Sequence, residues 1–156
     1  MTIIEVMENL AAHIRAAVSE YSTTQKAGDL PVEVYAGPPP VRTNSAEQRS
    51  FIYCAVTDFE DKENGESTAK IEIGFSIYDK DEADGWRSIY NLVEHVRQAV
   101  LKKRILGSRN ALLLPLKGEL IFMQPFPQWQ ARLTATYTIG HIDEEGIDYD
   151  TTLKTQ

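Results

Sequence analysis

The hydrophobic positions of residues 81–107 repeat at the intervals of an amphipathic helix. The residues that share this spacing are Ile89, Leu92, Val93, Val96 and Val100, and Trp86 extends the stripe by one turn. Intervals of three and four residues place such side chains on one face of a helix. Asp81 or Asp84 is suited to cap the first turn, and Gly107 is suited to end the helix. We therefore expect a helix that buries this stripe, with Trp86 between it and a sheet.

A second helix is predicted at the N-terminus. Thr2 and Glu5 have the spacing of a capping box. The apolar residues that follow at helical intervals are Ile3, Met7, Leu10, Ile14, Ala17 and Tyr21. The pattern predicts a helix that ends near Tyr21 and docks on a sheet; a partner-binding helix is the alternative.

Five segments have the alternation, or the β-branched and aromatic composition, that is typical of strands. They are residues 31–35, 50–58, 70–79, 119–124 and 129–141. The second and third are expected to pair as an antiparallel hairpin with a long acidic tip. Together with the two helices, they predict an α+β fold: an antiparallel β-sheet with two amphipathic helices packed mainly on one face.

The strand at 50–58 is apolar on both faces, so it is either central or in contact with another chain. Phe51 and Tyr53 lie on one of its faces. Phe126 and Trp129 belong to a proline-stiffened connection, a kind of segment suited to protein contacts. We take these four residues as candidates for a subunit interface. For Trp129 a place in the core is favoured over the interface, because an aromatic residue on an alternating strand face is usually inside.

Length and charge set the broad class of the protein. A chain of 156 residues is expected to form one domain, here residues 1–141, followed by a polar, acidic and partly disordered tail at 142–156. The net charge of −7 argues against a protein whose whole surface grips nucleic acid or anionic lipid, and leaves a local basic patch open. The sequence has no apolar run that could span a bilayer and no recognisable secretion signal, so we expect a cytoplasmic protein.

No stretch of the sequence has the pattern of an active site. The histidines His13, His95 and His141 are scattered without metal-ligand spacing. The acidic loops at 58–66 and 79–90 miss the ligand positions of an EF-hand. The single cysteine, Cys54, lies in an apolar strand, and nucleophile and phosphate-binding motifs are absent. We therefore expect no catalytic residue, no cofactor and no metal site.

Several local phrases, and the order of elements, resemble the tail terminator (tail completion, minor tail) proteins of tailed bacteriophages. Residues 84–92 read Asp-Gly-Trp-Arg-Ser-Ile-Tyr-Asn-Leu and open the helix described above. Pro125, Phe126 and Pro127 then precede the closing alternating strand at 129–139. The resemblance covers residues 1–141, and the acidic tail has no counterpart in it.

The resemblance implies a non-enzymatic phage or prophage structural protein. Its partners would be further copies of itself in a ring, typically a hexamer, the tail tube protein and the head completion protein. The ring would cap the head-proximal end of the tail tube and help join tail to head. DNA would pass through without specific binding, and no membrane would be involved. The protein would reside in the virion tail, and in the host cytoplasm during assembly.

Two other classes of function stay open at this point. One is another tail or head–tail connector subunit of similar fold. The other is a small-molecule-binding or enzymatic α+β domain, because a fold alone does not fix a function.

Overall fold

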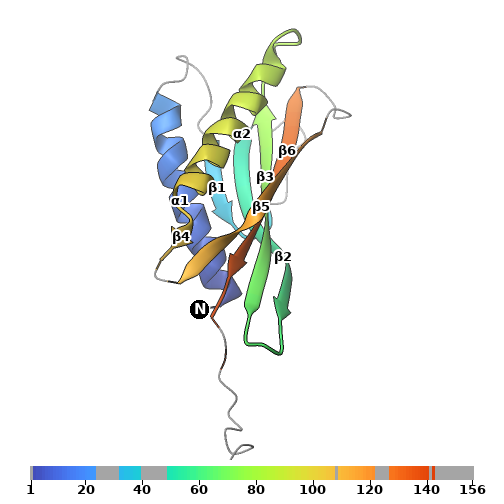
Figure 1. Cartoon of the computed structure of the whole chain (residues 1–156). Helices are drawn as coiled ribbons and strands as arrows, with labels where there is room; N and C mark the ends of the chain where they lie inside the picture. The colour runs from blue at the N-terminus through green and yellow to red at the C-terminus, as the bar shows by residue number, and fades with distance from the viewer. Residues whose placement is uncertain are drawn as a thin grey trace, which may run out of the picture.

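A computed structural model describes residues 2–23, 32–39, 49–107, 109–121, 127–140 and 142. The described elements, in chain order, are α1 (Ile3–Thr23), β1 (Val32–Ala36), β2 (Ser50–Asp61), β3 (Ser67–Tyr78), α2 (Gly85–Lys102), β4 (Ile105–Leu106), β5 (Asn110–Ile121) and β6 (Gln128–Thr138) (Figure 1). Two helices and a curled sheet make an α+β fold, as predicted. None of the described helices is long and apolar enough to cross a membrane. Apart from Ile142, the predicted acidic tail lies outside the described residues.

The strands form one mixed sheet in the order β1-β2-β3-β6-β5-β4. All neighbouring pairs are antiparallel except β1 and β2, which run parallel with Val34 opposite Ile52. The prediction of a purely antiparallel sheet is therefore wrong at this edge. Residues 37–49 separate the two strands, and a parallel pair requires a connection of about a dozen residues.

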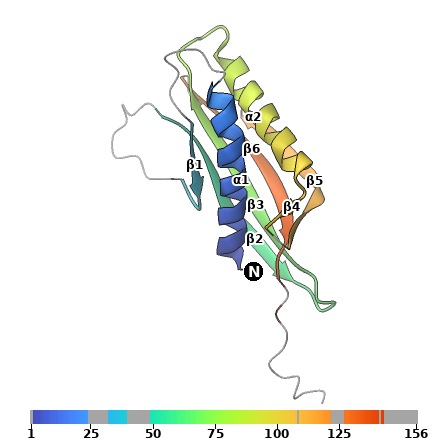
Figure 2. The same ribbon diagram turned by 90° about the vertical axis from the view of Figure 1, so that its left-hand side faces the viewer.

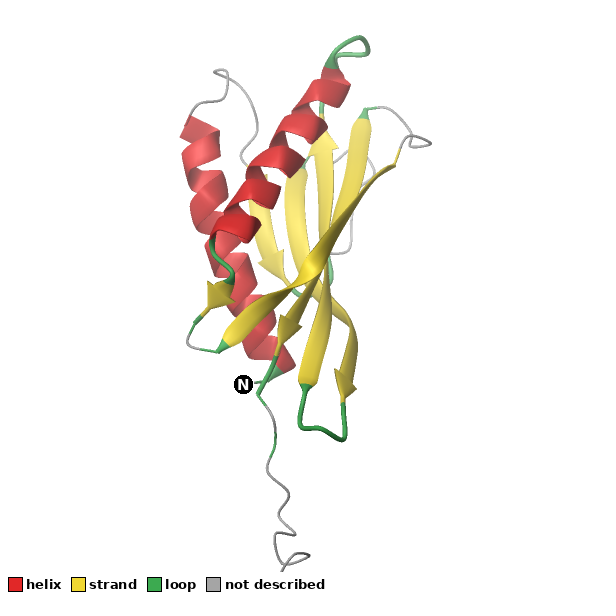
Figure 3. Cartoon of the chain, in the orientation of Figure 1, coloured by secondary structure: helices red, strands yellow, loops and turns green. Residues whose placement is uncertain are grey.

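Both helices cover the same face of the sheet (Figures 2 and 3). The inward-pointing residues of β3 are Ile71, Ile73, Phe75 and Ile77, which were predicted to share one face, and all four are buried. Ile52 and Cys54 of β2 and Leu133 and Ala135 of β6 extend this layer sideways. The core therefore lies between the helices and one face of the sheet, and no described helix lies on the other face.

Helix α1 begins as predicted but buries a rotated face. The backbone N–H of Glu5 donates to Thr2 Oγ1 at 3.1 Å, which satisfies one free donor of the first turn. The fully buried side chains are Val6, Leu10, Ala11, Ile14 and Val18, whereas Ile3, Met7 and Ala17 are only half-buried. The helix also continues to Thr23. The buried stripe is thus centred one position away from the predicted one.

Helix α2 buries Ile89, Leu92, Val96 and Val100, as predicted, but the prediction for Trp86 is wrong. Trp86 is 38% exposed, and its indole N–H donates to Ala83 O at 3.0 Å. The space under the first turn is filled by Trp129 instead. A Cβ atom on Gly85 would lie 2.9 Å from Trp129 Nε1, so glycine allows the close approach.

The two ends of α2 also differ from expectation. Asp81 accepts the backbone N–H groups of Ala83 and Asp84 at 3.0 Å, while Asp84, at the N-cap position, makes no capping hydrogen bond with its side chain. The helix stops at Lys102, before Gly107. Gly107, with φ at 56°, follows β4 and turns the chain towards β5. Gly107 therefore forms the turn between β4 and β5, and it does not end the helix as predicted.

Candidate functional site

The face of the sheet that carries no described helix is called the open face here. Its residues are Phe51 and Tyr53 of β2, Glu72, Gly74 and Ser76 of β3, Gln130, Arg132 and Thr134 of β6, and Lys117, Glu119 and Ile121 of β5. Cross-strand pairing places Tyr53 opposite Gly74 and Gly74 opposite Arg132. The alternation of the strands thus brings two of the predicted interface residues, Phe51 and Tyr53, onto one surface.

Tyr53 is fixed on the open face by two contacts. Its ring lies over Gly74, where any Cβ atom would overlap the ring carbons. Its hydroxyl donates to Glu72 Oε2 at 2.7 Å. Partial burial, and then the hydrogen bond to Glu72, raise the pKa of Tyr53 to about 12. The phenol therefore stays neutral and acts as a hydrogen-bond donor at physiological pH.

Arg132 continues this polar row across the sheet. Its Nε donates to Glu119 Oε2 at 2.9 Å, and its Nη1 donates to Glu72 Oε1 at 3.3 Å. These hydrogen bonds raise the pKa of Arg132. The row Tyr53–Glu72–Arg132–Glu119 therefore links β2, β3, β6 and β5, with Arg132 held between two carboxylates.

A hollow of about 310 Å³ lies on the open face, lined in part by this row. Phe51 and Tyr53 line it together with Pro39, Ser76, Ile121 and Gln130. Phe51 is half-buried, with the Tyr35 ring at 6.2 Å in an edge-to-face arrangement and the Arg49 guanidinium at 6.0 Å. An aromatic hollow bordered by paired polar groups is suited to contact with another surface.

The structure separates the other two predicted interface residues from this surface. Trp129 lies on the helix-covered side, where its indole N–H donates to Asp79 O at 3.1 Å and its ring packs against Gly85. It is half-buried and packs against the core. Phe126 lies outside the described residues. An interface role for any of the four residues stays a prediction.

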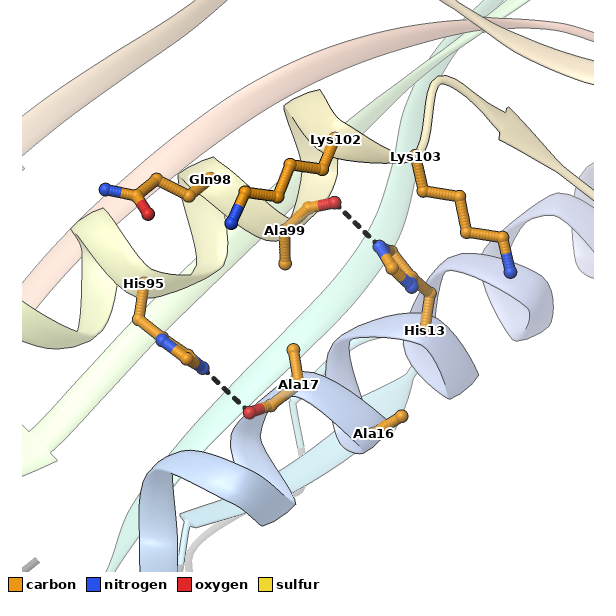
Figure 4. A pocket seen from close by; sticks show the side chains of 8 residues that line it. All are labelled: His13, Ala16, Ala17, His95, Gln98, Ala99, Lys102 and Lys103. Carbon is orange, nitrogen blue, oxygen red and sulfur yellow. Dashed lines mark hydrogen bonds between the residues drawn. The ribbon is translucent and has the colours of Figure 1, made fainter. Parts of the chain in front are cut away.

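A second candidate site is the interhelical cleft, a depression of about 340 Å³ between α1 and α2 (Figure 4). Its lining residues are His13, Ala16, Ala17, His95, Gln98, Ala99, Lys102 and Lys103. His13 Nε2 donates to Ala99 O at 2.8 Å, and His95 Nε2 donates to Ala17 O at 2.8 Å. Since a carbonyl only accepts, each Nε2 must carry a hydrogen. Each helix therefore sends one histidine to the backbone of the other.

Sequence reasoning did not find this cleft, because it treated the histidines as isolated. A partial signal exists: His13 lies next to the buried Ile14, and His95 next to the buried Val96. Both histidines thus border an apolar stripe, which is where two helices packed side by side on a sheet approach each other. Whether each imidazole ring reaches the backbone of the opposite helix depends on the distance between the helices, which cannot be derived from the sequence.

Two features bear on metal binding and thiol chemistry among the described residues. Among them, no group of three or more His, Cys, Asp or Glu residues could hold a metal ion. Cys54 is fully buried, and burial raises the pKa of its thiol to about 12. A thiol in that environment is a poor nucleophile.

Comparison with known proteins leaves the family open. No protein-family model matches the chain. No curated protein matches it either. A solved chain from the "Virion of native gene transfer agent (GTA) particle" is similar over 88% of this chain and 96% of that chain, with 14% sequence identity and a TM-score of 0.46.

Proposed function

We propose that this chain is a structural subunit of a phage or prophage particle and catalyses no reaction. In this proposal it caps the head-proximal end of the tail tube as a ring and helps join the tail to the head. The observation that carries the proposal is the open face of the sheet, together with the sequence resemblance to tail terminator proteins. Partners would be further copies of the chain, the tail tube protein and the head completion protein.

The open face has the composition expected of a contact surface. One face of the sheet is covered by helices, whereas the other presents Phe51 and Tyr53 around a hollow. Interfaces typically have aromatic anchors at their centre and polar groups with satisfied hydrogen bonds around them. The row Tyr53–Glu72–Arg132–Glu119 supplies such paired groups. Covering this face by a neighbouring subunit would bury the aromatic rings, and Arg132 already has its carboxylate partners in place.

The negative net charge of the chain supports a role in which the protein surrounds DNA without binding it. A net charge of −7 repels phosphates, which suits a channel through which DNA slides. A closed ring further requires a head-to-tail contact between two different patches of the subunit. The absence from the sequence of nucleophile, metal and phosphate-binding motifs agrees with a role in assembly.

Deletion of the gene in its parent phage tests the proposal. Without a cap, a tube grows past its proper length and cannot join a head, so filled tailless heads beside abnormally long tubes are expected. Electron microscopy of the lysate measures both. Tails of normal length that remain firmly joined to heads would refute the terminator role. A complete lack of tails would favour the alternative, a tube or connector subunit of similar fold.

A further inference from the structure

The interhelical cleft carries positively charged side chains, although the chain as a whole has a net charge of −7. None of its eight lining residues is acidic, and two of them are Lys102 and Lys103. Neither lysine forms a salt bridge with any described residue. With Arg104 they make the longest run of basic residues in a chain of net charge −7. Lysines at a helix C-terminus complement the helix dipole, but that role does not require them to line a cleft.

The hairpin formed by β2 and β3 is an acidic arm. Its end, residues 57–66, extends past the N-terminal end of α1 in two perpendicular views (Figures 1 and 2). The acidic residues of this segment are Asp58, Glu60, Asp61, Glu63 and Glu66, all exposed, and Lys62 is its single cation. The tip is held by hydrogen bonds from Lys62 N to Glu66 O at 2.8 Å and from Gly65 N to Lys62 O at 3.0 Å. The arm is therefore preformed, which lowers the entropy lost on binding.

An aromatic side chain accompanies the acidic groups of the arm. Phe59 is 59% exposed, although its strand neighbour Ala69 is buried. An exposed phenylalanine among carboxylates is a candidate anchor for a partner surface. In the cleft, Ala16, Ala17 and Ala99 leave apolar space between the basic groups (Figure 4). The arm and the cleft therefore match both in charge and in apolar surface.

We infer that the interhelical cleft of one copy receives the acidic β2–β3 arm of a second copy of the chain. The carboxylates of the arm lie beside Lys102 and Lys103, and Phe59 packs on the alanines. This inference rests on the proposed assembly function and names its intersubunit contact. The arm extends the same two strands that carry Phe51, Tyr53 and the open face.

Arm and cleft lie apart on one molecule, so a contact between them forms between two copies. The arm continues the strands of the sheet, and its tip lies apart from the C-terminal end of α2 (Figure 1). Arm and cleft are different patches, so their contact is head-to-tail and can close a ring. Because copies of net charge −7 repel one another, a local pairing of opposite charges favours their association at this contact.

Disulfide crosslinking of the full chain tests the contact. Glu63→Cys and Lys103→Cys proteins are mixed at high concentration under mild oxidation, and disulfide-linked dimers of the two variants are expected. The native thiol interferes little, since Cys54 is fully buried. Lys80→Cys is the matched control, because Lys80 is also an exposed lysine but lies before the start of α2. It should give no crosslink with Glu63→Cys.

Charge reversal adds a second, independent measurement. The variant Lys102→Glu with Lys103→Glu should weaken self-association on the order of tenfold in sedimentation experiments. Combining it with Glu60→Lys and Glu63→Lys in the partner copy should restore association. Equal crosslinking of Glu63→Cys to Lys80→Cys and to Lys103→Cys would overturn the docking of the arm. So would a charge reversal that leaves self-association unchanged. Neither outcome would contradict an assembly role. A chain that neither associates nor crosslinks at any concentration would overturn the docking too, and the phage deletion would then decide the assembly role separately.

Discussion

Two tyrosines show how differently the same side chain is used in this fold. Tyr137 is fully buried, and its hydroxyl has no hydrogen-bond partner among the described residues. Tyr53 is half-buried and donates to Glu72 at 2.7 Å. Burial raises the pKa of Tyr137 well above its usual value. An unsatisfied buried hydroxyl costs free energy, whereas a paired one stabilises the fold modestly.

Tyr137→Phe is therefore expected to leave the free energy of unfolding unchanged or to raise it by up to about 1 kcal/mol. Tyr53→Phe, the matched control, should lower it by roughly 0.5–1.5 kcal/mol, because it removes a hydrogen bond. Urea unfolding of both variants measures the difference. A loss of more than about 1 kcal/mol in Tyr137→Phe would reveal a partner for that hydroxyl.

The two tryptophans differ in the same way. Trp86→Ala should lower the free energy of unfolding by less than about 1 kcal/mol, because the ring lies on the outer surface of α2, edge-on to Tyr90 at 5.3 Å. Trp129→Ala should cost about 3 kcal/mol, since it empties the space under Gly85. Denaturant melts compare the two variants directly. Equal losses would contradict the placement of Trp129 beneath the start of α2.

Alkaline pH should destabilise the fold through Cys54 and Tyr53. Burial raises the pKa of Cys54 from 9.0 to about 12, and burial with the Glu72 hydrogen bond raises that of Tyr53 from 10.0 to about 12. The unfolded chain therefore loses these protons first, and stability falls as pH rises from 9 towards 12. Urea midpoints measured at several pH values should show the fall.

Single substitutions separate the two groups in that experiment. Cys54→Ala should remove the part of the fall that begins near pH 9. Tyr53→Phe should reduce the part that begins near pH 10, to which Tyr137 also contributes because burial raises its pKa. A midpoint that stays constant across this range would show that neither group is shielded in the folded protein.

At the scale of elements, periodicity predicted correctly which residues form helices and strands, but it predicted less well where each helix begins and ends. The stripe of α2 and the alternation of β3 were correct because burial on one face dictates them. Trp86 was misplaced because a residue distant in sequence, Trp129, already occupies the space under Gly85. The direction of β1 was missed because it depends on the path of the chain from β1 to β2, which composition does not specify.

The link between the helices could not be predicted for a similar reason. His13 and His95 are 82 positions apart (95 − 13) and meet the opposite helix only once both helices lie on the sheet. His13→Ala and His95→Ala should each lower the free energy of unfolding by about 1 kcal/mol, because each removes a hydrogen bond between the helices. Gln98→Ala, which alters the same cleft without removing such a bond, should change it by less than about 0.5 kcal/mol.

Amide hydrogen exchange provides the readout for this prediction. His13→Ala should expose the last turn of α2 to faster exchange, because Ala99 O then keeps the bond from Lys103 N at 3.3 Å. His95→Ala should instead speed exchange in α1 around Ala17, whose carbonyl loses its histidine partner. Exchange that is as slow as in the wild type, with unchanged stability, would show that the two histidines do not hold the helices together.

At the scale of the whole molecule, the sheet separates a covered face from an open one. The sequence indicated that strand 50–58 is apolar on both faces, and the structure accounts for each face. Ile52 and Cys54 lie under the helices, whereas Phe51 and Tyr53 lie on the open face. The sequence could not show that Trp129 belongs to the covered side, because alternation alone does not say which face of β6 is inward.

The open face leads to a prediction about assembly that does not depend on the fold being disturbed. Phe51→Lys places a charge in the hollow, and a buried unpaired charge opposes contact with another surface. The variant should fold, as judged by a normal thermal transition, yet fail to restore tailed particles to a phage that lacks the gene. Ile4→Lys makes the same exchange of an apolar residue for a lysine on α1, where Ile4 is 57% exposed. It should restore tails as well as the wild type does, and equal restoration by both variants would exclude the open face as an assembly contact.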